Sequence, residues 1–181
     1  FYGEIKNSDL IEAIGGIPLH VVKPITVVGK INDQNGEMYA NCSAPHFIYN
    51  NTELKNGHIA ITAPDDTLNY DFGAIKMNGN NSTLKLNIFG KAYDNRLTAS
   101  LYFDNNGTKY MEGLLNTETV FYNSEGQRKA DISITPSFLN INDEDWTINP
   151  ANITYIQDKL SINNFKISNN LFSSIFFFLS L

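Results

Sequence analysis

Residues 84–103 contain the clearest structural signal of the chain: Leu84-Lys-Leu-Asn-Ile88, followed by Leu97-Thr-Ala-Ser-Leu-Tyr-Phe103. Every second residue of these runs is apolar, which is the pattern of a β-strand that buries one face. The second run continues into Asp104-Asn-Asn-Gly107, and such residues favour tight turns because they tolerate left-handed backbone. The sequence therefore predicts neighbouring strands joined by short turns.

The same pattern recurs through most of the chain. Between Ile25 and Ile167, runs with apolar residues at alternate positions are separated by turn residues such as Pro64-Asp-Asp66 and Asn123-Ser-Glu-Gly126. A new run begins roughly every 8 to 14 residues, which leaves no room for the crossover helices of a parallel sheet. The expected fold class is all-β, and the expected topology is an antiparallel meander.

Each expected strand has an apolar face and a polar face, so the sheet must cover or use its apolar side. Two layers could close this face into a dry core, as in a sandwich or a barrel. Alternatively, the meander curls into an extended groove with an apolar lining. Bulges at Gly29, Gly73 or Gly90 would reverse which residues face inward. The strand pattern alone leaves both arrangements open.

One window near the N-terminus has helical periodicity. It begins with a capping serine, has an apolar face of Leu10, Ile11 and Ile14, and is followed by Gly15-Gly16. We therefore expect one short helix at residues 8–14.

The C-terminal residues 171–181, Leu-Phe-Ser-Ser-Ile-Phe-Phe-Phe-Leu-Ser-Leu, differ in composition from the rest. They are too few to cross a bilayer as a helix, which takes about 20 residues. We interpret residues 1–170 as a single segment of a larger protein. Residues 171–181 form an atypical hydrophobic tail, which we interpret as a truncation or frame-shift scar or as a strand that loses its pattern; the alternative is a membrane anchor.

Charge and motifs argue against catalysis and against nucleic-acid binding. The net charge is −6, and Lys and Arg are scattered singly rather than gathered in a stripe. His20, His46 and His58 lie far apart, and none has a second ligand at metal-binding spacing. No nucleophile elbow, phosphate-binding loop or zinc-protease motif is present. We predict that the protein is not an enzyme and uses no cofactor.

Two acidic clusters and one thiol are the remaining candidates for a metal-binding or reactive site. Asp65-Asp66 and Asp143-Glu-Asp145 offer clustered oxygens but lack the spacing and glycine of a calcium loop. We interpret them as acidic turns and expect no metal site. Cys42 is the single cysteine, so no disulfide is possible within the chain, and we expect a small, half-buried side chain.

Two passages resemble a known family. Ile17-Pro-Leu19 through Val27-Val-Gly-Lys-Ile31 resembles a passage of the AsmA-like and TamB-like proteins of Gram-negative bacteria. Ile132-Ser-Ile-Thr-Pro136, Asp145-Trp-Thr-Ile-Asn-Pro150 and the run from Asp158 to Ser168 resemble the TamB-type proteins of Bacteroidota-like genomes. The likeness spans residues 8–170, while the last eleven residues depart from the family pattern.

This resemblance implies a long periplasmic protein, anchored in the inner membrane by a segment outside this chain. Its sheet would curl into a lipid-conducting groove of the β-taco type, which moves phospholipid between the inner and outer membranes or supports outer-membrane protein assembly. The implied partners are phospholipid acyl chains and, through the full-length chain, an outer-membrane assembly protein. The alternative is a structural or adhesive β-repeat domain of a cell-surface protein with a closed, dry core. The expected groove lining comprises Ile59, Ile61, Leu68, Tyr70, Phe72, Leu84, Leu86, Ile88, Leu97, Leu101, Phe103, Ile132, Ile134, Ile153, Tyr155, Leu160 and Ile162.

Overall fold

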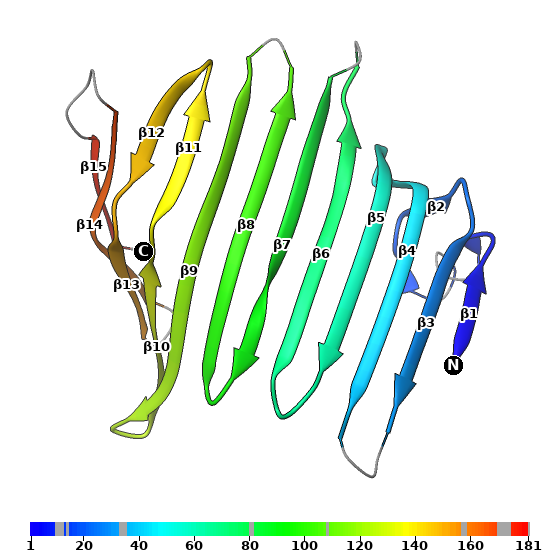
Figure 1. The fold of residues 1–181 in the computed structure, drawn as a ribbon, viewed down its shortest axis with the longest axis horizontal. Helices are drawn as coiled ribbons and strands as arrows, with labels where there is room; N and C mark the ends of the chain where they lie inside the picture. Colours follow the sequence, from blue (N-terminus) through cyan, green and yellow to red (C-terminus); the bar gives the residue numbers. More distant parts are fainter. Residues whose placement is uncertain are drawn as a thin grey trace.

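The computed structural model describes residues 1–9, 13, 15–32, 36–79, 82–107, 109–156, 159–169 and 175–180. These residues form fifteen β-strands in one antiparallel sheet (Figure 1). The expected all-β antiparallel meander is confirmed. The helix expected at residues 8–14 depends on residues 10–12 and 14, which lie outside the described residues. No helix in the described part of the chain could span a bilayer.

The strands follow one another along the chain with short connections. They are β1 (Tyr2–Ile5), β2 (Leu19–Val21), β3 (Ile25–Ile31), β4 (Met38–Tyr49), β5 (Thr52–Ala63), β6 (Leu68–Met77), β7 (Thr83–Tyr93), β8 (Arg96–Asn106), β9 (Met111–Ser124), β10 (Gln127–Ile134), β11 (Ser137–Ile141), β12 (Glu144–Ile148), β13 (Ala151–Ile156), β14 (Lys159–Asn169) and β15 (Ile175–Ser180).

Tight turns connect several pairs of neighbouring strands. The central residues Asn50-Asn51, Asp94-Asn95 and Asn142-Asp143 all have positive φ, between 44° and 66°. Two consecutive left-handed residues match the right-handed twist of a hairpin, and Asn and Asp adopt this conformation at lower cost than most residues. The many Asn and Asp residues therefore set the meander.

Prolines interrupt the strands near both ends of the sheet. β10 and β11 both pair with β9, and Pro136 separates them. On the other side, β13 pairs with β10 and β12 pairs with β11, and Pro150 separates β12 from β13. β2 and β3 likewise both pair with β4 on either side of Pro24. Proline lacks the N–H that a ladder needs, so pairing stops there and the chain can bend.

A β-bulge lies in β5. The register of β5 against β6 shifts between Lys55 and His58, and Asn56 in the interval has a φ of 52°. A one-residue bulge transfers the following residues to the other face. The bulges expected at Gly29, Gly73 or Gly90 are absent, because all three continue regular pairings with a neighbouring strand.

The sheet is open, and it is neither closed nor strongly curled. Figure 1 shows the long strands β3–β9 side by side, with β10, β13 and β14 turned away from their plane. The strongly curled groove expected from the sequence is therefore not seen. The pairings from β6 to β9 run without a shift, so no break bends the centre of the sheet.

Buried apolar residues form two small clusters, one at each end of the sheet. The N-terminal cluster contains Val21, Ile25 and Ala44, and the C-terminal cluster contains Ile134, Ile148 and Ala151. Each lies beside proline interruptions. The core of the described residues is thus divided, and the broad centre between the clusters has no second layer above it.

Candidate functional site

The strand register assigns side chains to two faces. Residues paired across neighbouring antiparallel strands point to the same side of the sheet. Ile59, Phe72, Ile88, Leu101 and Leu115 pair in sequence from β5 to β9 and form one such row. We call this side the apolar face and the opposite side the polar face.

The register brings the residues expected to line a groove, from Ile59 to Tyr155 and at Ile162, onto the apolar face. Ile132, Ile153 and Ile162, for example, pair in a row that continues from Leu97 through Thr119. The backbone of Leu160, the remaining residue of that set, pairs with Tyr155. The apolar side chains expected to act together therefore share one side of the sheet.

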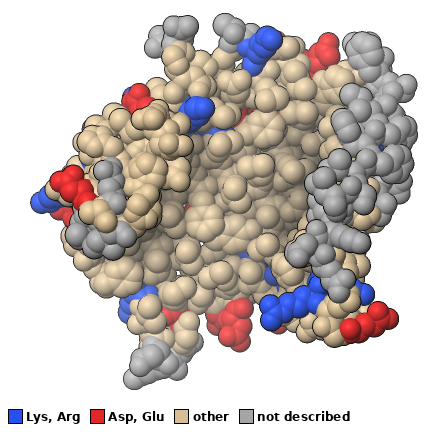
Figure 2. Space-filling view, turned by 180° about the vertical axis from the view of Figure 1, so that it is seen from behind, with Lys and Arg blue, Asp and Glu red and all other residues tan. Residues whose placement is uncertain are grey.

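The centre of this face is exposed. Ile59, Phe72, Leu86 and Ile88 keep between 36% and 44% of their surface accessible. Figure 2 shows the broad face seen from behind, with Lys, Arg, Asp and Glu mostly near its outline and uncharged residues across its middle. A continuous exposed apolar surface of this kind is unusual for a soluble protein and typically marks a binding surface.

A hollow of about 330 Å³ lies in this exposed centre. Small residues on neighbouring strands, Ala44, Gly57 and Ala74, lie among larger ones such as Phe72 and Leu86 and leave this space. A Cβ at Gly57 would lie 3.2 Å from the Cβ of Ala44, so the chain has little room for a larger residue there. The hollow is open on one side and has an apolar lining.

Cys42 also lines this hollow. The side chain is partly buried, and this burial raises the pKa of its thiol above the usual 9.0. A thiol with a raised pKa is mostly protonated near neutral pH, and the thiolate is the nucleophilic form. Cys42 therefore has the properties of a packing residue rather than of a catalytic thiol.

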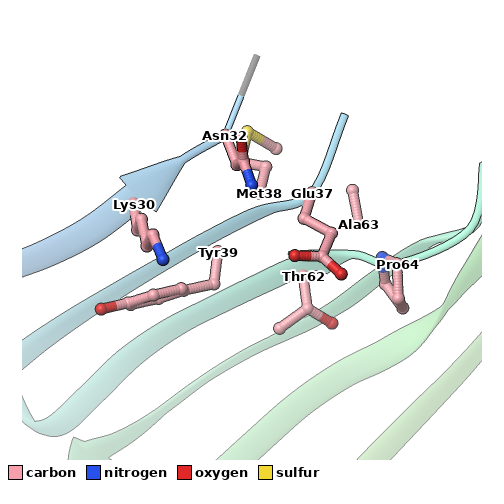
Figure 3. A pocket seen from close by; sticks show the side chains of 8 residues that line it. All are labelled: Lys30, Asn32, Glu37, Met38, Tyr39, Thr62, Ala63 and Pro64. Atoms are coloured by element: carbon pink, nitrogen blue, oxygen red, sulfur yellow. The ribbon is translucent and has the colours of Figure 1, made fainter. Parts of the chain in front are cut away.

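A second pocket, of about 460 Å³, lies at the end of the sheet where β3, β4 and β5 meet their turns (Figure 3). Lys30, Glu37, Tyr39 and Thr62 are among its lining residues, so its walls are more polar than the central hollow. The described residues that line it include no histidine or cysteine.

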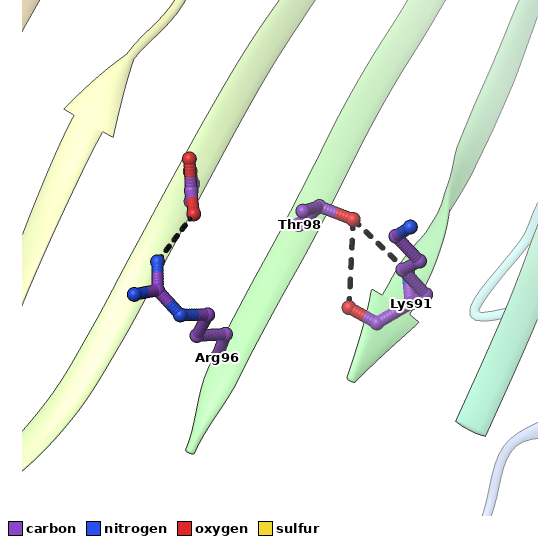
Figure 4. Close-up of polar contacts among 4 residues, drawn as sticks. Lys91, Arg96 and Thr98 are labelled. Carbon is purple, nitrogen blue, oxygen red and sulfur yellow. Dashed lines mark hydrogen bonds and ion pairs between the residues drawn. The ribbon is translucent and has the colours of Figure 1, made fainter. Parts of the chain in front are cut away.

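Polar contacts hold together the polar face. Arg96 donates to a carboxylate oxygen of Glu118 over 2.9 Å, and the backbone N–H of Lys91 donates to the Thr98 hydroxyl (Figure 4). The cross-strand pair His58 and Asp71 lies on the same side, with 3.0 Å between the ring nitrogen and the carboxylate oxygen. Exposed pairs of this kind stabilise the fold only slightly.

Glu112 accepts two tyrosine hydrogen bonds on the polar face, from Tyr102 at 2.8 Å and from Tyr110 at 2.7 Å. These bonds, with that of Tyr110 the larger, lower the pKa of the Glu112 carboxyl. Burial, followed by the bond to Glu112, raises the pKa of Tyr102 to about 12. The bond to Glu112 is the main cause that raises the pKa of Tyr110 to about 12.

The three histidines stay apart in the structure. His46 lies 2.9 Å from Glu53, His58 contacts Asp71, and His20 belongs to β2. Among the described residues no three possible metal ligands come together, and this includes the acidic turns at Asp65-Asp66 and at residues 143–145.

Phe138 does not continue the apolar alternation of Ile132 and Ile134. It is 44% exposed and pairs with Leu114 and Thr147. Leu139 packs against the C-terminal cluster instead. The interruption at Pro136 changes which residues face inward. Counting every second residue through Pro136 cannot detect this change.

The sequence did not indicate the central hollow. Ala44, Gly57 and Ala74 are small residues without a motif, and the bulge that brings Gly57 onto the apolar face begins at a residue that is usually polar and exposed, Asn56. The one available signal was Asn56-Gly57, a dipeptide that favours left-handed backbone.

Comparison with known proteins adds no further guide. No protein-family model, no curated protein and no solved structure matches the chain.

Proposed function

We propose that the chain is a segment of a periplasmic lipid-conducting sheet whose apolar face carries phospholipid acyl chains. The observation that supports this proposal best is the row of exposed apolar side chains across the centre of an open sheet. Covering such a surface lowers the free energy because apolar area is removed from water, and an acyl chain can cover it without any specific polar contact.

Acyl chains suit this surface energetically. Covering one methylene group contributes about 0.8 kcal/mol when burial is complete, and a shallow trough provides only part of that amount. A chain of many methylenes would still bind, although each position contributes little. Neighbouring positions offer similar apolar contacts, so we expect low specificity and lateral movement of the lipid along the face.

The proposed groove is shallower than the curled groove that the resemblance implies. Its walls would be the two ends of the sheet, where the strands are interrupted at Pro24 and at Pro136, and its floor would be the centre. Lipid would lie on this floor with its head group toward water. The inner-membrane anchor, the transport between membranes and the outer-membrane assembly partner are parts of the proposal that rest on the sequence resemblance.

Two residues of β7 that lie on opposite faces test the proposal. Leu86 is on the apolar face and 42% exposed, and Phe89 is on the polar face and 37% exposed, both in β7. Leu86→Glu and Phe89→Glu each add one charge at a similar exposure. The measurement is the amount of phospholipid that copurifies with the full-length protein, determined by mass spectrometry, with circular dichroism as the check on folding.

We expect Leu86→Glu to lose most of its bound phospholipid while it keeps a β-type spectrum, because a half-exposed carboxylate can reach water. Phe89→Glu should retain its lipid. Equal lipid content in the two variants would contradict the proposal. Unfolding of Leu86→Glu alone would favour the alternative, a β-repeat domain in which a second layer buries this face, because a charge in a closed core is strongly destabilising.

A further inference from the structure

Lys76 is an exception on the apolar face. It pairs with Leu54 on one side and with Leu84 on the other, and it follows Phe72 and Ala74 along the same side of β6. The residues of β4 to β9 are all described, and Lys76 is the one charged residue among them that the register places on this face. An apolar surface therefore carries a single positive charge at one end of its long strands.

Other basic side chains nearby have partners. The amino group of Lys55 lies 3.3 Å from Glu53, and those of Lys85 and Lys91 lie over the rings of Tyr102 and Tyr93. Lys76 is exposed, and the described residues give it no ion pair or ring contact. Its charge is available to a group from outside the chain.

The central hollow begins close to Lys76. Ala74, which lines the hollow, is two residues earlier in β6, a separation of about 7 Å along a strand. An alkyl chain in the hollow would thus end beside the amino group if it ran along β6. The long lysine stem can lie on apolar surface while its charge remains in water.

We propose that Lys76 binds the anionic head group of a lipid whose acyl chain lies in the central hollow. This inference rests on the proposed function and adds a ligand class to it: anionic lipids are preferred over uncharged ones. Charge complementarity supports this choice, since the register of β4 to β9 places one charged side chain on the apolar face, and that side chain is a cation. Because the pair is exposed, the preference should be modest and should decrease at high salt.

The single cysteine allows a direct test with the unlabelled protein. Cys42 lines the same hollow, so a chain that occupies the hollow should slow alkylation of its thiol by N-ethylmaleimide. The probes are laurate and its uncharged analogue lauramide, at equal concentrations and fixed pH. The variants are Lys76→Met and, as a matched control on the polar face, Lys85→Met.

In the wild-type protein and in Lys85→Met, laurate should protect Cys42 at a concentration about two- to fivefold lower than lauramide. In Lys76→Met the two probes should protect equally. Retention of the preference in Lys76→Met, or its loss in Lys85→Met as well, would overturn the role of Lys76.

The remaining outcomes separate this inference from the proposed function. If both probes protect the wild-type thiol equally, the anionic preference is wrong and acyl-chain binding stands. If neither probe protects Cys42 at any soluble concentration, the hollow does not bind acyl chains and both proposals fail.

Discussion

The ends and the centre of the apolar face have the same kinds of side chain but differ in their burial. Val21, Ile25, Ile134 and Ile148 at the two ends are between 5% and 9% exposed. Ile59, Phe72, Leu86 and Ile88 in the centre are between 36% and 44% exposed. Composition therefore does not determine which apolar residues stabilise this protein and which remain available.

Interruptions of the strands account for the difference. Pro24 and Pro45 lie near the N-terminal cluster, and Pro136 and Pro150 lie near the C-terminal cluster. Where the ladder stops, the chain bends and covers its own apolar side chains. From β6 to β9 the pairing has no register shift, and the apolar side chains of these strands stay accessible.

The largest expected effect is on stability at the end clusters. Ile134→Ala should destabilise the protein by about 2–4 kcal/mol, because it removes a buried side chain and leaves a cavity. Ile88→Ala, on the same face but 44% exposed, should cost less than half as much. Urea unfolding of both variants measures the difference, and equal losses would show that the centre is covered in solution.

Enlarging a small residue should also affect stability differently in the C-terminal cluster and in the central hollow, and this is the next largest expected difference. Ala151 is 4% exposed in the C-terminal cluster, so Ala151→Leu should overpack it and cost about 1–3 kcal/mol. Ala74→Leu projects into the open hollow, so it should leave the unfolding midpoint nearly unchanged and reduce the protection of Cys42 by laurate. A large loss of stability in Ala74→Leu would mean that the hollow is filled in the folded protein.

A smaller effect should appear on the polar face as pH changes. The pKa of Glu112 is lowered in the folded protein, so its contribution to stability is present above about pH 4.5 and is lost as pH falls through the folded value. Glu112→Gln should therefore lower the melting temperature at pH 7 and matter less at pH 3. If the melting temperature of Glu112→Gln differs from that of the wild type by the same amount at both pH values, the stabilising role of the ionised Glu112 carboxylate is contradicted.

The two tyrosines should show the opposite dependence. The pKa values of Tyr102 and Tyr110 are raised to about 12, so the stability they contribute is present below pH 10 and is lost as pH rises through about 12. Absorbance titration of the folded protein should show their ionisation above that of ordinary tyrosines, and Glu112→Gln should move it down. Ionisation of all tyrosines near pH 10 would contradict the hydrogen-bonded arrangement.

The fold class could be predicted because it depends on local patterns. The alternation in Leu84–Ile88 and Leu97–Phe103 fixed neighbouring strands with a common apolar side, and the Asn-rich and Asp-rich breaks indicated hairpins. Both signals act within a few residues, where sequence and backbone conformation are directly linked.

The shape of the sheet could not be predicted in the same way. Curvature depends on how interruptions in different strands align, as Thr135-Pro136 and Asn149-Pro150 do across paired strands. This alignment is a property of the register and not of either sequence run. The central hollow depends likewise on Ala44 and Gly57 being partners across two strands.

The central claim is that one face of the sheet binds acyl chains and the other does not. A photoreactive phenylalanine analogue at Ile88 or at Phe89 in the full-length protein places the same probe on opposite faces of β7. After irradiation in cells, we predict that mass spectrometry will detect phospholipid adducts at position 88 and few at position 89. Equal adducts at both positions, or adducts to protein alone at position 88, would contradict the account.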